Sequence, residues 1–209
     1  MTGQFRTKHA ARDAVWDRMK AAHVAAFPFP IRGRIPNFKG ARNAACLLFT
    51  VEPWKSARRI KVNPDSPQRP VREEALRRGI TVLVPTPRLK GGFRRLDPAR
   101  IPEDAFAEAA TIAGAVRWGE EIALRDLPQL DAVVCGSVAV TATGDRCGKG
   151  EGYSDIEFAI LRELGHRAIP VATTVHPLQV VDAMPQDRID QPLSLIATTE
   201  RIILSLIHI

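Results

Sequence analysis

The residues whose types and spacing suggest chemistry lie in one glycine-rich segment. It reads Gly144-Asp145-Arg146-Cys147-Gly148-Lys149-Gly150-Glu151-Gly152-Tyr153-Ser154-Asp155. Glycines at this density allow positive φ angles and a close approach of the backbone to a ligand. Inward-pointing N–H groups, together with the unpaired N–H groups that begin a following helix, attract an anion. Because Arg146 and Lys149 add positive charge, the segment is a candidate phosphate-binding turn.

The spacing of these glycines matches no standard nucleotide fingerprint, since Gly-x-Gly-x-x-Gly is absent and Gly-x-x-x-x-Gly-Lys-Ser/Thr is only approximated. A long polar loop before an ordinary helix is the alternative. Ser154 and Glu157 have the spacing of a capping box. Asp155 would then lie at the helix start, either to hold a divalent ion against phosphate oxygens or simply to favour the helix N-terminus by its charge. The phosphate interpretation is favoured because ligands gather at the carboxyl ends of strands in open α/β sheets.

The elements that must position this turn follow from apolar runs and their breaks. The pattern predicts a basic loop over 88–101, and no element is assigned over 118–127. Strands alternate with helices, which favours a mainly parallel sheet covered on both faces. We expect a single three-layer α/β/α domain over residues 1–209 with a Rossmann-like sheet. The predicted helices cover 8–26, 40–50, 71–78, 103–113 and 154–165, and the predicted strands cover 59–62, 81–84, 131–135, 138–141, 169–175, 193–197 and 202–209.

Charge is divided unevenly along the chain, whose formal net charge is +7. Residues 1–100 hold 22 Lys and Arg against 7 Asp and Glu, which gives +15, and residues 101–209 hold 8 against 16, which gives −8. The basic half suggests a polyanionic partner. An RNA-binding module is a distant alternative, because the basic residues are not interleaved with aromatic ones as in stacking platforms.

Other features of the sequence exclude several classes of protein. No run of 18 or more apolar residues exists, so we expect no membrane span. The chain has three cysteines without metal-ligand spacing, and no apolar signal-peptide core begins it, which favours reduced thiols in a cytoplasmic protein. The apolar run after residue 202 ends without a polar tail, so we expect a native C-terminus different from the sequence beyond about residue 203.

The glycine-rich segment resembles the Gly-x-Arg-Leu-Gly-x-Gly-x-Gly-Tyr-Tyr-Asp signature of 5-formyltetrahydrofolate cyclo-ligases, also called methenyltetrahydrofolate synthetases. Lys8 and Arg12 have the Lys-x-x-x-Arg spacing of the N-terminal helix in that family, and 81–85 is similar to its strand ending in Val-Pro. Asp65 stands where the family carries an acidic folate contact. The segments 35–40, 62–67 and 85–89 resemble the divergent branch called methenyltetrahydrofolate synthase domain-containing.

The resemblance implies an enzyme that uses ATP and Mg²⁺ to convert 5-formyltetrahydrofolate into 5,10-methenyltetrahydrofolate. Arg146 and Lys149 would act on the transferred phosphoryl group, Asp155 would ligate Mg²⁺, and Asp65 with Tyr153 would contact a reduced folate that could carry a polyglutamate tail. Arg34 and Lys39 are weaker phosphate candidates. The residues implied to bind the nucleotide are Lys8, Arg12, Arg146, Gly148, Lys149, Gly150, Gly152 and Tyr153. The sequence does not indicate an oligomeric state.

Departures from the family pattern fall mainly on the folate side. Ser154 replaces the second signature tyrosine, and Asp65 is shorter than the family's acidic residue. The alternative is therefore a paralogue that binds ATP together with another metabolite, such as a thiamine precursor. Outside the signature, we interpret His176 before Pro177 as structural, and the tryptophans as packing residues, of which one could stack on the pterin.

Overall fold

The computed structural model describes residues 3–86, 92–166, 169–187 and 190–205, with the backbone alone of residues 153–155. Within these ranges, the main sheet has eight strands in the order β13-β12-β10-β7-β3-β4-β5-β6. All pairings from β12 to β4 are parallel, whereas β13, β5 and β6 join antiparallel at the two edges. The prediction of a mainly parallel sheet is therefore confirmed. The strands are β3 (Arg59–Val62), β4 (Thr81–Pro85), β5 (Phe93–Leu96), β6 (Glu120–Ile122), β7 (Ala132–Cys135), β10 (Val171–Thr174), β12 (Leu195–Ala197) and β13 (Ile202–Leu204).

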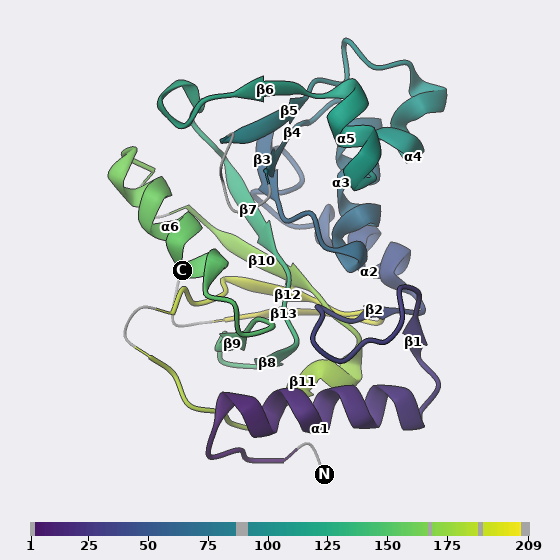
Figure 1. Cartoon of the computed structure of the whole chain (residues 1–209), viewed down its shortest axis with the longest axis vertical. Helices are drawn as coiled ribbons and strands as arrows, with labels where there is room; N and C mark the ends of the chain where they lie inside the picture. The colour runs from purple at the N-terminus through teal and green to yellow at the C-terminus, as the bar shows by residue number, and fades with distance from the viewer. Residues whose placement is uncertain (1–2, 87–91, 167–168, 188–189, 206–209) are drawn as a thin grey trace.

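Helices cover both faces of this sheet, as Figure 1 shows. Ile60 and Val62 of β3 face a cluster built with α2 (Ala41–Leu48), α3 (Arg69–Arg77), α4 (Phe106–Ala109) and α5 (Ile112–Trp118). Leu83 and Val133 face the opposite cluster, which contains Phe158 of α6 (Tyr153–Glu163). Alternate strand residues thus point to opposite helical layers, which confirms the three-layer arrangement.

A third apolar cluster packs α1 (Lys8–Ala21) against a small second sheet. Val15 and Met19 of α1 pack against Ala139 and Cys147. The small sheet has the order β11-β8-β9, and a further hairpin pairs β1 with β2. Its strands are β8 (Ala139–Thr141), β9 (Arg146–Cys147) and β11 (Val180–Val181), and the hairpin is β1 (Ala25–Ala26) with β2 (Asn37–Phe38). The N-terminal helix is thereby held against the segment that follows β7.

Several predicted boundaries were wrong. The helix expected over 8–26 ends at Ala21, because His23 adopts a positive φ of 53° that no α-helix continues through. The segment expected as a loop over 88–101 contains β5, and the unassigned stretch 118–127 contains β6. The helix expected over 103–113 is divided, because Thr111 caps a new helix by accepting a hydrogen bond from the Gly114 N–H.

No helix among the described residues is long and apolar enough to cross a membrane.

Candidate functional site

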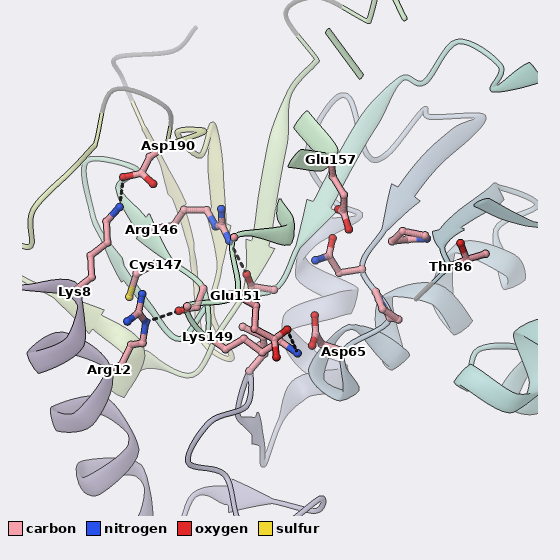
Figure 2. Close-up of a pocket in the computed structure, with 18 residues that line it drawn as sticks. Lys8, Arg12, Asp65, Thr86, Arg146, Cys147, Lys149, Glu151, Glu157 and Asp190 are labelled. Carbon is pink, nitrogen blue, oxygen red and sulfur yellow. Dashed lines mark hydrogen bonds and ion pairs between the residues drawn. The ribbon is translucent and has the colours of Figure 1, made fainter. Parts of the chain in front are cut away.

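A cavity of about 370 Å³ opens where the parallel strands end. This volume lies within the range of roughly 300–1,000 Å³ that is usual for small-molecule sites. Asn63 follows β3, Thr86 follows β4 and Gly136 follows β7, so the cavity lies at the carboxyl ends of three neighbouring strands. This is the position expected for a ligand in an open α/β sheet. Figure 2 shows residues of α1 and of the glycine-rich segment at one end and those of the main strands at the other.

The glycine-rich segment is built differently from the single loop that the sequence predicted. Residues 146 and 147 form β9, which pairs antiparallel with β8. The remaining turn then reaches Gly152, whose φ of 73° makes it the left-handed N-cap of α6. Gly150 also has a positive φ, of 99°. The glycines at these two positions therefore let the chain fold back on itself immediately before the helix.

The predicted capping box does not form. The residue before α6 is glycine, which offers no side chain to the helix N-terminus. Glu157, which was expected to complete the box, instead accepts a hydrogen bond from the Nζ atom of Lys61 in β3. A long-range ion pair therefore replaces the local cap.

Cations of two elements converge on the turn. The Arg146 side chain is buried, and its Nη2 donates to the Gly136 carbonyl at 3.3 Å, which ties the turn to the end of β7. The Nε atom of Arg12 donates to the Gly148 carbonyl at 2.7 Å, which docks α1 on the turn. Lys149 is partly exposed and pairs with Glu151 at 2.9 Å. A bound polyanion would replace Glu151 as the partner of Lys149.

Lys8 is held at the rim of the cavity by two carboxylates. Its Nζ contacts Asp187 at 2.7 Å and also contacts Asp190, which itself lines the cavity. Burial disfavours the ammonium, but the hydrogen bonds and charges of the two aspartates outweigh burial and raise the pKa of Lys8. A role for Lys8 in phosphate binding thus requires that it exchange a carboxylate for a phosphate.

The opposite end of the cavity is acidic. Asp65 and Glu157 both line it. Burial raises the pKa of Asp65, and the charge of Glu157 acts in the same direction, although Lys149, Arg72 and the Asn63 amide oppose both effects. Among the described residues, carboxylates therefore line the cavity on both sides: Glu151 and Asp190 pair with Lys149 and Lys8, whereas Asp65 and Glu157 lie away from α1.

Most of the residues that the sequence predicted lie around one cavity. The side chains of Tyr153 and Asp155 lie outside the described part of the structure. Arg34 and Lys39 are not among the residues that line the cavity. Those that do line it are Lys8, Arg12, Asp65, Arg146, Gly148, Lys149, Gly150 and Gly152.

Other residues that line the cavity were not predicted as site residues, among them Asn63, Thr86, Gly136, Glu157 and Asp190. The first three could have been found, because each directly follows a predicted strand of a parallel sheet. Glu157 was assigned to a cap, and no local pattern marks Asp190.

His176 has the structural role that was expected. It caps the short helix 177–179, because its Nδ1 accepts a hydrogen bond from the Leu178 N–H and the Gln179 side chain bonds back to the His176 N–H. Trp16 and Trp54 are buried in apolar clusters. None of the three tryptophans lines the cavity, so the idea that one stacks on a ligand there is not supported.

A metal site made by protein side chains alone is not found in the described ranges, where no cluster of three or more His, Cys, Asp or Glu has suitable geometry. The donors present suit a polyanion better, since arginine, lysine and glycine N–H groups bind phosphate oxygens.

Comparisons with known proteins show which family this chain belongs to. Residues 7–199 match the model of the 5-formyltetrahydrofolate cyclo-ligase family. The chain is 42% identical over 204 residues to the methenyltetrahydrofolate synthase domain-containing protein of Mus musculus, which covers 94% of the chain and 55% of that protein. It is 38% identical over 189 residues to the Homo sapiens protein of the same name, which covers 88% of the chain and 49% of that protein. The chain thus spans about half the length of these relatives.

Solved structures agree on the fold. The 5,10-methenyltetrahydrofolate synthetase of Aquifex aeolicus superposes with a TM-score of 0.58 at 17% identity, over 95% of this chain and 93% of the other. The 5,10-methenyltetrahydrofolate synthetase of Mycoplasma pneumoniae gives a TM-score of 0.55 at 15% identity, over 92% and 99%. At these identities the likeness concerns the fold alone. From the match over most of its length, the chain belongs to the 5-formyltetrahydrofolate cyclo-ligase family.

Proposed function

We propose that this protein binds ATP with Mg²⁺ and converts 5-formyltetrahydrofolate into 5,10-methenyltetrahydrofolate. The observation that carries the proposal is the convergence of Arg12, Arg146 and Lys149 on one cavity at the carboxyl ends of parallel strands. In this proposal the cations of the glycine-rich turn hold the triphosphate, and the part of the cavity beside Asp65 and Glu157 holds the organic substrate. Membership of the cyclo-ligase family supports this assignment.

The proposed reaction needs little acid–base chemistry from the protein. The formyl oxygen attacks the γ-phosphorus, the bond to the β-phosphate oxygen breaks, and ADP leaves. N10 then attacks the activated carbon, and inorganic phosphate departs with the former formyl oxygen and the N10 proton. Phosphoryl transfer of this kind depends on positioning and on neutralising charge.

The cations of the turn would supply that neutralisation. Arg146 is fixed by its bond to the Gly136 carbonyl, so its guanidinium is preorganised rather than recruited. Arg12 is fixed by its bond to the Gly148 carbonyl. Lys149 is the less restrained cation and would follow the transferred phosphoryl group. Bound Mg²⁺ would neutralise the phosphate oxygens, with Asp155 as its proposed protein ligand.

A second candidate is an ATP-dependent reaction on another nitrogen heterocycle, such as a thiamine precursor. It is favoured by the substitutions on the folate side, Ser154 and the short Asp65, which leave the cations of the turn intact. Binding measurements with 5-formyltetrahydrofolate and with thiamine intermediates separate the two candidates. Retained ATP binding without any folate binding would favour the second.

A further inference from the structure

The acidic end of the cavity contains a buried ion pair that the predicted site did not include. Lys61 is fully buried in the middle of β3, and its Nζ contacts Glu157 and the Oδ1 atom of Asn63, the latter at 2.6 Å. Glu157 comes from α6, 96 residues later in the chain. The pair therefore joins the sheet to the helix that follows the glycine-rich turn.

The stability of the fold does not by itself account for this ion pair. Replacing a buried ion pair by well-packed apolar side chains is often neutral or stabilising, so burial alone does not explain its presence. Glu157 also lines the cavity. Lys61 bonds to its Oε2 atom, and no described residue donates a hydrogen bond to its Oε1 atom. The ammonium thus fixes the carboxylate while one acceptor oxygen remains for a ligand.

Further hydrogen-bond acceptors lie near this part of the cavity. Asn63 accepts a hydrogen bond from Lys61 Nζ through its Oδ1 atom, and both Asn63 and Asp65 line the cavity. The Oε1 atom of Gln68 is fully buried and has no hydrogen-bond partner among the residues that the structure describes. A Cβ built on Gly136, which lines the cavity, would lie 3.0 Å from Asp65 Oδ2 and 3.1 Å from that Gln68 oxygen. The side-chain oxygens that line the cavity here, on Asn63, Asp65 and Glu157, suit a ligand that supplies N–H groups.

We propose that Glu157, oriented by Lys61, is a specificity-determining residue that accepts hydrogen bonds from a nitrogen heterocycle bearing ring N–H and amino groups. A reduced pterin and an aminopyrimidine share this chemistry. The inference rests on the proposed function, because it assumes that the cationic end of the same cavity holds the phosphates of a nucleotide. In Figure 2, Glu157 reaches down from α6 into the end of the cavity away from Lys8 and Arg12.

The test compares wild type with Glu157→Gln by calorimetric titration in the presence of a non-hydrolysable ATP analogue. The titrants are 5-formyltetrahydrofolate and the hydroxymethyl aminopyrimidine that forms half of thiamine. The glutamine keeps the shape and can still accept from Lys61, but it turns the second acceptor into a donor. We expect affinity for the bound heterocycle to fall about tenfold or more, as for loss of a charged hydrogen bond, while affinity for the ATP analogue changes less than about twofold.

A second variant separates recognition from a structural role. The double substitution Lys61→Met with Glu157→Leu removes both charges together and leaves neither one buried without a partner. We expect it to unfold at a denaturant midpoint equal to or above that of wild type and still to lose affinity for the heterocycle. Such a result would exclude a loss caused by misfolding.

These experiments distinguish a failure of the proposed role of Glu157 from a failure of the proposed cyclo-ligase reaction. Binding of one of the two heterocycles by wild type, weakened in both variants, supports the inference and shows which heterocycle is used. Wild-type affinity in the folded double variant overturns it, as does a wild-type protein that binds neither heterocycle. Binding without turnover to the methenyl product contradicts the proposed cyclo-ligase reaction alone.

Discussion

At the scale of single residues, the cations that line the cavity differ in how firmly the protein holds them. Arg12 and Arg146 are each fixed to a backbone carbonyl, whereas Lys149 pairs with the Glu151 side chain of the same turn. The first two cations therefore contribute to the structure as well as to ligand binding. Lys149 is the position at which a substitution reports on ligand binding with least effect on the fold.

Replacing Lys149 by alanine should weaken ATP binding by about 10- to 100-fold, because a charge-assisted hydrogen bond contributes about 1.5–3 kcal/mol. Titration with ATP measures the change. Lys39→Ala is the matched control, since it removes the same charge from an exposed lysine that does not line the cavity. Equal losses in the two variants would mean that general charge, and not the turn, attracts the nucleotide.

Replacing Asp65 by asparagine should stabilise the protein at neutral pH. Burial raises the pKa of Asp65 above its usual 3.8, so protonation of the native state is favoured relative to the unfolded state. The stability linked to this group is fully present below pH 3.8 and is lost as the pH rises through the raised folded value. Urea unfolding should show the advantage of Asp65→Asn over wild type shrinking as the pH is lowered through this window. An advantage that is constant with pH would contradict this account.

At the scale of elements, strands in the centre of the sheet could be predicted from the sequence, whereas the edge strands β5 and β6 could not. β4 and β7 are short apolar runs, β3 carries Ile60 and Val62, and the predicted ranges of all three agree with the structure within a residue. β5 was missed because Arg94 and Arg95 break its apolar pattern. Each arginine pairs across the strands with a glutamate of β6, so the strand is supported by partners that local sequence does not reveal.

The candidate site was predictable as far as its residues are local. The glycine-rich turn was marked by its glycines and cations, and Lys8 and Arg12 were assigned through the resemblance to the family; residues of both segments line the cavity. Glu157 could not be assigned, because the same Ser-x-x-Glu spacing serves a cap in one context and an ion pair in another. Only the packing of α6 on β3, which brings Lys61 within reach, decides between them.

The left-handed N-cap of α6 gives a prediction at this scale. Gly152→Ala should lower the free energy of unfolding by about 1–2 kcal/mol, since an L side chain is strained at its φ of 73° although nothing lies within 4 Å of the added Cβ. It should also weaken ATP binding, because the turn and the helix start are displaced. Denaturant unfolding and nucleotide titration measure the two effects.

Gly79→Ala is the matched control for this variant. Gly79 has a φ of 74° and equally open space, but it follows α3 and does not line the cavity. It should show the same loss of stability with unchanged ATP affinity. Unchanged ATP affinity in both variants would contradict a role for the backbone of the turn in nucleotide binding.

At the scale of the whole molecule, both halves of the sequence contribute cations to the cavity. The basic half contributes α1 with Arg12, and the acidic half contributes the turn with Arg146 and Lys149, so the cationic end is made by both halves. A charge of +15 on residues 1–100 exceeds what one triphosphate requires. We therefore expect the basic surface to attract a polyanionic tail on the substrate.

Salt should weaken this attraction in proportion to the charge on the tail. Raising the ionic strength shortens the Debye length from about 10 Å at 0.1 M to about 3 Å at 1 M. The KM for a polyglutamylated folate should consequently rise more steeply with salt than the KM for the monoglutamate. Parallel salt dependences for the two substrates would show that the surplus charge has no part in binding the tail.

The central claim is tested most directly by the ultraviolet absorbance of the methenyl product. Mixing the protein with ATP, Mg²⁺ and 5-formyltetrahydrofolate should generate 5,10-methenyltetrahydrofolate and equimolar ADP, with no product when ATP is omitted and greatly reduced product in the Lys149→Ala and Asp155→Ala variants. Tight binding of ATP by folded wild-type protein without any methenyl product would contradict the cyclo-ligase assignment.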